Sequence, residues 1–205
     1  MAFYAYYLID ERKTGIVDSW DKCKIIISKK NSRYKKFNTL ELANEWIKNG
    51  CTYEKKEIDY SSLIKDAIYF DAGTGRGIGV EVRVTDVNKN SLLHYVLPDN
   101  LINKFGNYQV GPTRTNNFGE LTGLFFALKY ALKYDIKYIL GDSKLVIDYW
   151  VHCIYNKNNI DDDTINLIQR TNKLYNEFVS RNGVLKRISG DINPADLGFH
   201  KWKSR

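Results

Sequence analysis

The segment AIYFDAGTGRGIGVEVRVT, residues 67–85, decides how the larger part of this chain folds. Four apolar residues lead to Asp71, as expected for a buried strand that ends at this carboxylate. From residue 77 to residue 85, valines alternate with Glu81 and Arg83, which is typical of a strand with one exposed face. The glycine-rich residues between the two runs favour a turn. The segment therefore predicts a pair of neighbouring strands.

Helical and extended patterns alternate after this pair of strands. Leu121, Leu124 and Leu128 recur at helical spacing after Glu120, so one face of a helix should pack against a sheet. By the same reasoning we expect strands at residues 91–97, 137–140 and 184–188, and helices at residues 143–154, 164–180 and from 193 onward. Antiparallel strands followed by alternating helices and strands predict an α/β fold, with a mixed five-stranded sheet flanked by helices.

Residues 1–50 are expected to form a separate unit. Strands are predicted at residues 3–9, 15–17 and 33–37. One helix is expected after a cap provided by Ser19 or Asp21, and a second after the capping residue Thr39. Asn49 and Gly50 end the second helix. Residues 51–66 mix charged and polar residues without periodicity and are expected to form a linker. The sequence thus predicts a small three-stranded α/β domain at residues 1–50, a linker, and a larger domain at residues 67–205.

Charge and cysteine content limit the classes of function. The 205 residues include 31 Lys and Arg against 24 Asp and Glu, so the net charge of +7 predicts attraction to polyanions such as nucleic acid. Cys23, Cys51 and Cys153 lie far apart and form no CxxC pair, so neither a disulfide framework nor a zinc site is expected. No apolar run is long enough to cross a membrane, and the N-terminus has no signal-peptide pattern. We expect a cytoplasmic monomer with no membrane partner.

Four acids stand where a predicted strand ends or a helix begins: Asp71, Glu120, Asp142 and Asp196. Each has a structural alternative. Asp71 can serve in a turn, and Glu120 can form a capping pair with Asn117. Asp142 and Asp196 can stabilise helix starts. In a sheet of this kind, however, strand ends and helix starts meet at one edge, where like charges repel unless a cation is present. Because Mg²⁺ prefers carboxylate oxygens, the four acids predict a divalent-metal site.

The residues around these acids resemble the ordered motifs of type 1 ribonuclease H over residues 67–200. The strings that carry the resemblance are IYFD at residues 68–71, TNNFGEL at 115–121, GDS at 141–143 and NPADL at 193–197. The resemblance implies a ribonuclease H-like fold in which the four acids bind two Mg²⁺ ions, or Mn²⁺ in their place. It also implies that Asn116 and Asn117 contact the minor groove of an RNA/DNA hybrid and that Thr115 lies near a phosphate.

This family implies an endonuclease that hydrolyses the RNA strand of RNA/DNA hybrids and leaves 5′-phosphate and 3′-hydroxyl ends. Two cations about 4 Å apart would activate a water molecule and hold the leaving 3′ oxygen. A requirement for a 2′-hydroxyl at the site would allow RNA to be cut and DNA to be spared. The rival interpretations are a catalytically silent binder of hybrid or double-stranded RNA, and a fold relative such as a junction resolvase or an exonuclease.

Two departures from the family pattern concern the substrate side of the site. The loop before the last acid usually carries a His, but residues 189–192 are SGDI, so we hypothesise that Asp191 takes its place. Some relatives also carry a basic, Trp-containing protrusion, whereas residues 156–163 hold one Lys and three Asp. The grip on the substrate is therefore expected to come from elsewhere.

The front unit resembles the small hybrid-binding domain of many type 1 ribonucleases H, which is also found in caulimovirus inclusion proteins. Residues 28–36 contain five Lys or Arg and no acid, and cations on phosphates beside aromatic rings grip a duplex without reading its sequence. The resemblance implies a nucleic-acid-binding surface formed by Tyr4, Trp20, Arg33, Tyr34, Lys35 and Lys36, with double-stranded RNA as a second candidate ligand. Phe37 and Trp46 are expected to pack in the core.

Overall fold

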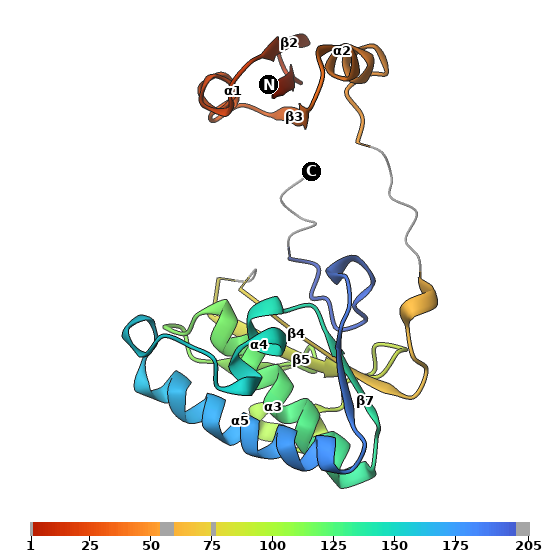
Figure 1. Ribbon diagram of the computed structural model, residues 1–205, viewed down its shortest axis with the longest axis vertical. Coiled ribbons are helices and arrows are strands. Elements are labelled where there is room, and N and C mark those ends of the chain that lie inside the picture. Colours follow the sequence, from red (N-terminus) through yellow and green to blue (C-terminus); the bar gives the residue numbers. More distant parts are fainter. Residues whose placement is uncertain (1, 54–59, 75–76, 200–205) are drawn as a thin grey trace. The chain divides into compact units, whose positions relative to one another are not determined.

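The computed structural model describes residues 2–53, 60–74 and 77–199, and the chain divides into two compact units, Met1–Glu57 and Ile58–Arg205. Each unit has a sheet and helices of its own (Figure 1). The boundary between the units falls inside the predicted linker at residues 51–66, of which residues 54–59 lie outside the described residues. Each unit also has its own hydrophobic core.

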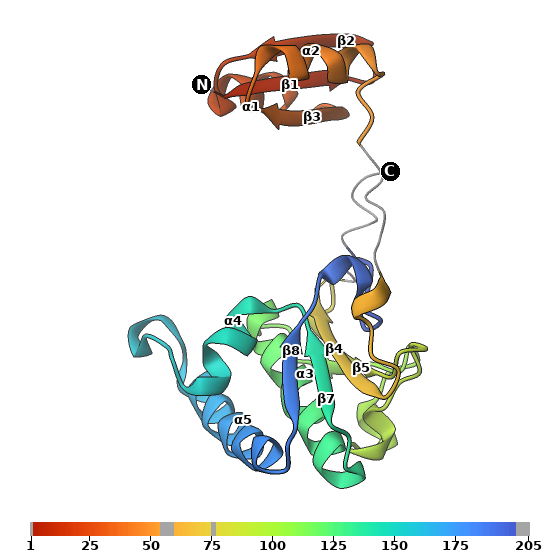
Figure 2. The ribbon, with the colours of Figure 1, turned by 45° about the vertical axis from the view of Figure 1, so that its right-hand side comes forward.

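The N-terminal unit is an antiparallel three-stranded sheet with two helices, as predicted (Figure 2). Its elements are β1 (Phe3–Leu8), β2 (Lys13–Val17), α1 (Trp20–Ile27), β3 (Ser32–Phe37) and α2 (Leu40–Lys48), and the strand order is β2-β1-β3. Of the two candidate caps of the first helix, Ser19 is the N-cap and Asp21 lies in the first turn, and the predicted cap Thr39 is confirmed. Ser19 Oγ accepts a hydrogen bond from the amide of Lys22 (3.3 Å). Thr39 Oγ1 accepts one from the amide of Leu42 (3.3 Å). These bonds satisfy amide groups that the start of a helix leaves without a partner.

The two helices of this unit cover opposite faces of its sheet. Successive residues of a strand point to opposite faces. Ala5 packs with Ala43 and Trp46 on the side of α2, whereas Tyr6 packs with Cys23 on the side of α1. Trp46 is 6% exposed, which confirms its predicted place in the core. The odd-numbered residues of β1 therefore face α2, and the even-numbered residues face α1.

Residues 51–53 pack on the N-terminal unit. Cys51 is buried, and Trp46 Nε1 donates a hydrogen bond to the carbonyl of Thr52 (2.8 Å). The hydroxyl of Tyr53 accepts a hydrogen bond from the amide of Tyr34 (3.0 Å) and donates one to the carbonyl of Tyr34 (3.1 Å). Because β3 is an edge strand, this hydroxyl covers backbone groups that another chain could otherwise pair with.

The larger unit is built on a mixed five-stranded sheet in the order β6-β5-β4-β7-β8. Its strands are β4 (Ala67–Gly73), β5 (Val80–Thr85), β6 (Tyr108–Val110), β7 (Tyr138–Gly141) and β8 (Val184–Arg187). Its helices are α3 (Asn116–Tyr134), α4 (Lys144–Asp148) and α5 (Asp162–Ser180), with 3₁₀ turns η1 (Tyr60–Ser62), η2 (Leu93–Tyr95), η3 (Asp99–Leu101), η4 (Trp150–His152), η5 (Lys157–Asn159) and η6 (Gly190–Ile192). β4 pairs with β5 antiparallel and with β7 parallel. The predicted fold class is confirmed.

Helix α3 lies between the sheet and α5 (Figure 1). It contributes Leu124 to a core that also contains Phe70 of β4 and Val82 of β5. A Cβ atom at Gly119 would lie 2.3 Å from Val80 Cγ1, so the absent side chain lets α3 approach the strands closely. This approach brings the next residue, Glu120, beside the end of β4.

No helix in the described part of the chain is both long and apolar enough to span a membrane.

The third strand of the antiparallel part is not the predicted one. Residues 91–97 contain η2 and only an isolated bridge between Thr85 and Ser91, and the strand that pairs with β5 is β6. Leu92 and Leu93 are both buried, whereas consecutive residues of a strand would point to opposite faces. The predicted strand was wrong because these two apolar residues fill the core from a turn.

Two predicted helices also differ in the structure. The helix expected over residues 143–154 ends at Asp148, and η4 follows it. The helix expected from residue 193 is absent from residues 193–199, the last that the structure describes. Here Asn193 Nδ2 donates a hydrogen bond to the carbonyl of Phe70 (3.0 Å), and Asn193 Oδ1 accepts one from the amide of Ala195 (3.0 Å). Side-chain bonds of this kind replace helical ones and hold the segment in a turn.

The variant Gly119→Ala tests the close approach of α3 to the sheet. The added methyl group overlaps with Val80 and Ala72, and overpacking of this kind costs about 1–3 kcal/mol. We expect the free energy of unfolding of the larger unit to fall by that amount in urea denaturation, although alanine is the better helix former. Gly111→Ala is the matched control, since a methyl group there meets no described atom within 4 Å. Equal stability of the two variants would contradict the close approach.

Candidate metal centre and nucleic-acid surface

Three of the four predicted acids converge at one end of the larger sheet. Asp71 lies near the end of β4, Glu120 lies in α3, and Asp142 directly follows β7. One carboxylate oxygen from each lies within 4.8 Å of the other two. Because β4 and β7 are parallel neighbours, with Tyr69 paired to Leu140, their C-terminal ends reach the same edge. Sheet topology thus brings together acids that are distant in the sequence.

The start of α3 places three predicted substrate-contacting residues next to this cluster. Thr115 is the N-cap, and its Oγ1 accepts a hydrogen bond from the amide of Phe118 (3.2 Å). The alternative in which Asn117 caps the helix and pairs with Glu120 is therefore wrong. Instead, Asn116 Nδ2 donates a hydrogen bond to Glu120 Oε1 (3.5 Å). Thr115, Asn116 and Asn117 are all exposed, within one and a half helical turns of the buried acid.

The loop before the last predicted acid lies against Asp142. A Cβ atom at Gly190 would lie 2.7 Å from Asp142 Oδ2, so a side chain at this position would displace the Asp142 carboxylate or η6. Asp191 is exposed on this turn, and its role in place of a His stays a prediction. The N-cap position of α4 belongs to Ser143, so Asp142 does not cap that helix.

Asp196 lies at the border of the three-acid cluster. Asp196 is half-buried. Its negative charge contributes to the raised pKa of Asp71. Its Oδ1 accepts a hydrogen bond from the amide of Gly198 (2.8 Å). The amide of Leu197 donates to Asp71 Oδ2 (3.1 Å), so the segment that carries Asp196 is bonded to the first acid. The hydrogen bond from Asn193 to the carbonyl of Phe70 in β4 holds the same segment at its N-terminal end.

Burial and mutual repulsion favour protonation of two of these acids. Burial, together with the charges of Asp142 and Asp196, raises the pKa of Asp71 to about 7. Burial, together with the charges of Asp71 and Asp142, raises the pKa of Glu120 to about 10. In addition, Glu120 Oε2 is buried and has no hydrogen-bond partner among the described residues. A bound cation would compensate the repulsion and give this oxygen a ligand.

The chemistry of the donors fits Mg²⁺ or Mn²⁺. All three clustered groups are carboxylates, which hard divalent cations prefer, whereas structural zinc sites are dominated by Cys and His. The orphaned oxygen of Glu120 is the sharpest sign of this fit, because a buried acceptor without a partner is costly.

Arg83 is a charged neighbour of the site that the sequence pattern did not reveal. It pairs with Asp71 across β4 and β5, so both side chains lie on the same face of the sheet. Burial lowers the pKa of Arg83, while Asp71 and Asp196 act in the opposite direction. Arg83 Nη2 also donates to the carbonyl of Lys89 (3.2 Å). The register that pairs Arg83 with Asp71 depends on how many residues form the turn between the two strands. The sequence did not give that number.

In the N-terminal unit, four predicted binding residues share the face of the sheet that α1 covers. The ring centroids of Tyr4 and Trp20 lie 5.8 Å apart, and those of Trp20 and Tyr34 lie 5.3 Å apart. Trp20 is 38% exposed and Tyr34 is 43% exposed, so these rings are open to a ligand. Lys36 pairs with Tyr4 across β1 and β3 and is exposed beside them. We call Tyr4, Trp20, Tyr34 and Lys36 the aromatic face.

The other two predicted binding residues lie on the opposite face. Arg33 and Lys35 alternate with Tyr34 and Lys36 along β3, and they therefore point toward the side of α2. Arg33 Nη1 donates a hydrogen bond to the carbonyl of Cys51 (3.4 Å). Lys35 Nζ lies 5.5 Å from the centroid of the Phe37 ring. The structure thus divides the predicted basic cluster between two faces.

A surface hollow lies next to the start of α3. It has a volume of about 380 Å³ and is lined on one side by Asn117. Other lining residues come from α4, η4 and the loop before α5, among them Asn156, Asn159 and Ile160. The hollow therefore lies between the start of α3 and the loop before α5, the loop where some relatives carry a basic protrusion.

Comparison with known proteins identifies the N-terminal unit. Residues 6–47 match the family described as the Ribonuclease H1 N-terminal domain, which confirms the predicted front domain. Among curated proteins, none matches the chain.

Two solved structures are similar to the chain. The RNase H1 from the halophilic archaeon Halobacterium salinarum NRC-1 is 19% identical, over 63% of this chain and 89% of that one, with a TM-score of 0.39. The N-terminal RNase H domain of rv2228c from Mycobacterium tuberculosis, solved as a fusion with maltose binding protein, is 22% identical, over 63% of this chain and 92% of that one, with a TM-score of 0.39.

The variant Asp142→Asn should stabilise the metal-free protein at alkaline pH. The pKa values of Asp71 and Glu120 are raised above the ordinary value of about 4. The stability that these groups contribute is therefore present below about pH 4 and is lost as the pH rises toward about 7 and about 10. Asp142→Asn removes one repelling charge, so its Tm at pH 8 should exceed that of the wild type, by about 2–4 °C per kcal/mol gained. Calorimetry in EDTA at pH 5 and pH 8 measures the difference.

In Mg²⁺ the wild type should have a higher Tm than Asp142→Asn, the reverse of the order expected in EDTA. A cation that binds the folded state raises the Tm of the wild type by mass action and has little effect on Asp142→Asn. Asp148→Asn is the control, because Asp148 is an exposed acid whose carboxylate lies 3.6 Å from Arg187. This variant should respond to Mg²⁺ like the wild type. A wild-type Tm that is the same with Mg²⁺ and with EDTA would speak against the metal centre.

Proposed function

We propose that this chain is a ribonuclease H, an endonuclease whose larger unit hydrolyses the RNA strand of an RNA/DNA hybrid while its N-terminal unit holds the hybrid. The observation that carries the proposal is the cluster of Asp71, Glu120 and Asp142, whose oxygens lie within 4.8 Å of one another. The match of residues 6–47 to the Ribonuclease H1 N-terminal domain supports it independently. Free thiols at all three cysteines are compatible with the cytoplasmic location that we propose.

The four acids would hold the divalent cations, two Mg²⁺ ions in our proposal. When bound, such ions lower the pKa of a water molecule and stabilise the charge that develops on the phosphate. Asn116 fixes Glu120 Oε1 by a hydrogen bond (3.5 Å), which leaves Oε2 as the acceptor for a ligand. Arg83 offsets part of the negative charge from the same face of the sheet. The proposed products carry 5′-phosphate and 3′-hydroxyl ends.

Substrate selection would depend on neutral groups at the start of α3. The exposed amides of Asn116 and Asn117 can donate and accept hydrogen bonds at base edges and at a 2′-hydroxyl. Thr115 Oγ1 uses a lone pair to accept from the amide of Phe118, so its own hydrogen remains able to bond a phosphate oxygen. The cap and the proposed phosphate contact are therefore compatible.

The aromatic face of the N-terminal unit would supply the grip. Exposed rings can pack on sugars while Lys36 contacts a phosphate, and neither contact reads a sequence. Once this unit is bound, the larger unit meets the same hybrid at a raised local concentration. Double-stranded RNA is a second ligand that such a surface would accept.

A catalytically silent binder of hybrid or double-stranded RNA is the second candidate function. It is favoured by the family match, which covers only the N-terminal residues 6–47. The buried carboxylates favour the enzyme, because a binding protein gains nothing from acids that repel one another beside a polyanion. Cleavage decides between the two candidates.

The protein should cut the RNA strand of a labelled hybrid in Mg²⁺ or Mn²⁺ and not in EDTA. RNA alone, duplex RNA and duplex DNA should remain intact. Asp142→Asn should lose at least about 100-fold of the rate, since it removes a carboxylate from the metal centre. Asp148→Asn should cut like the wild type, because its exposed carboxylate lies outside the cluster. Metal-independent cleavage, or binding without cleavage, would refute the proposed enzyme.

Neighbouring lysines on β3 should differ in their effect on binding. Lys36 belongs to the aromatic face, whereas Lys35 points to the opposite face. We expect Lys36→Ala to weaken hybrid binding and to reduce the slope of log K against log salt by about 1, the loss of one phosphate contact. Lys35→Ala should leave the slope nearly unchanged. Fluorescence anisotropy in Ca²⁺ across a salt series measures both, and equal slopes for the two variants would contradict the assignment of faces.

A further inference from the structure

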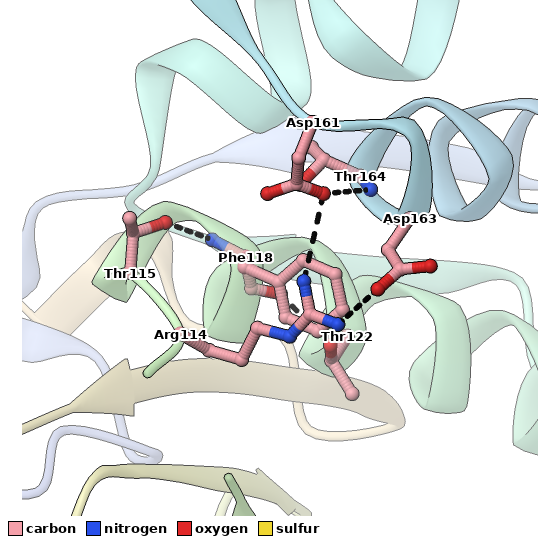
Figure 3. Close-up of polar contacts among 7 residues, drawn as sticks. All are labelled: Arg114, Thr115, Phe118, Thr122, Asp161, Asp163 and Thr164. Carbon is pink, nitrogen blue, oxygen red and sulfur yellow. Dashed lines mark hydrogen bonds and ion pairs between the residues drawn. The ribbon is translucent and has the colours of Figure 1, made fainter. Parts of the chain in front are cut away.

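Arg114 connects the start of α3 to the start of α5 (Figure 3). It immediately precedes the N-cap Thr115, and its guanidinium carbon lies 4.6 Å from the centroid of the Phe118 ring. Its Nη1 donates a hydrogen bond to Asp161 Oδ1 (3.5 Å), and its Nη2 forms an ion pair with Asp163 Oδ2. One side chain therefore contacts the first turn of each helix.

Each end of this bridge is itself fixed by local hydrogen bonds. On α5, Asp161 is the N-cap, and the same Oδ1 accepts a hydrogen bond from the amide of Thr164 (2.7 Å). On α3, Thr115 caps the amide of Phe118, and Thr122 Oγ1 donates to the carbonyl of Phe118 (2.8 Å). The atoms that Arg114 contacts thus belong to well-formed helix starts, and a bridge between them constrains the backbone on both sides.

The two elements that Arg114 joins also form the walls of the hollow beside the proposed substrate-contacting residues, whereas Arg114 itself lines a neighbouring hollow with Phe118 and Asp163. Asn117 lines the first of these hollows from α3, and Asn156, Asn159 and Ile160 line it from the loop that runs directly into Asp161. The spacing of the two walls therefore depends on whether the starts of α3 and α5 stay together.

We propose that Arg114 is a positioning residue that holds Asn116 and Asn117 at a fixed distance from the loop at residues 154–160. The inference rests on the proposed function, because it assigns the amides of α3 to contact with the nucleic acid. The proposed role requires the planar shape of the guanidinium group as well as its charge. A lysine could neutralise one carboxylate, but its ammonium group cannot bridge two acids and stack on Phe118 at the same time.

Kinetics on the full chain separate positioning from chemistry. Arg114→Ala should raise KM for an RNA/DNA hybrid about tenfold and leave kcat within about twofold, because contacts to the substrate are misplaced while the acids are not. Arg114→Lys should resemble Arg114→Ala. Asp163→Asn removes one partner of the bridge and should raise KM to a smaller extent. Arg170→Ala is the matched control, since Arg170 stacks on Phe125 (4.9 Å) from the middle of α5 and should keep the wild-type KM.

Hydrogen exchange provides a readout that does not need activity. In Arg114→Ala and Arg114→Lys, amide exchange should accelerate at residues 115–119 and 160–164, while the amides of the sheet keep their wild-type rates. If the wild type fails to cut hybrids, the proposed function falls, and the exchange data still decide whether Arg114 holds the two helix starts.

Two outcomes would overturn the role of Arg114. Wild-type KM and wild-type exchange in Arg114→Ala would show that the bridge constrains nothing. Wild-type behaviour of Arg114→Lys beside a defective Arg114→Ala would show that charge alone matters, by screening Asp161 and Asp163 from phosphates. An increase in KM for Arg170→Ala equal to that for Arg114→Ala would remove the specificity of the position.

Discussion

Repulsion among three carboxylates is the constraint on which the rest of the larger unit depends. Two unit charges 4.8 Å apart, the upper limit of the observed separations, repel by about 3.5 kcal/mol at an effective dielectric constant of about 20. The fold holds them together in two ways: β4 and β7 end at the same edge, and Gly119 lets α3 approach the strands. Asn193 binds the segment that carries the fourth acid, Asp196, to Phe70. Packing elsewhere has to offset this cost, because functional sites are commonly less stable than the rest of a fold.

An acidic centre creates a second problem, because the proposed substrate is a polyanion. In our proposal, attraction of the substrate and chemistry belong to different units. Exposed aromatic rings and Lys36 lie on a unit with its own core, distant in the sequence from the acids. In the larger unit, two arginines already have acidic neighbours: Arg83 lies beside Asp71, and Arg114 bonds Asp161 and Asp163. The positive charge of these two side chains is therefore partly offset before a phosphate approaches.

The sequence predicted those features that depend on local pattern. Asp71 lies near the end of β4, Asp142 directly follows β7, and Thr39 caps α2, so the places of these residues were predicted correctly. Prediction from the sequence was wrong where a contact with a residue distant in the sequence determines the local structure. Asn193 forms a turn because its amide reaches Phe70, 123 positions earlier. Leu92 and Leu93 enter the core together from a turn, which a two-residue period cannot describe. The pairing of Arg83 with Asp71 and the bridge of Arg114 likewise exist only after the chain has folded.

The division of the basic cluster on β3 shows how composition and geometry differ as guides to function. Five cations within residues 28–36 predict affinity for a polyanion, but alternation along the strand directs Lys36 toward the aromatic face and Lys35 and Arg33 away from it. Charge attracts any nucleic acid and weakens with salt, whereas the amides of Asn116 and Asn117 are neutral and depend on their position. Because we assign the two properties to different units of the chain, binding strength should follow the ionic strength while the preference for a hybrid does not.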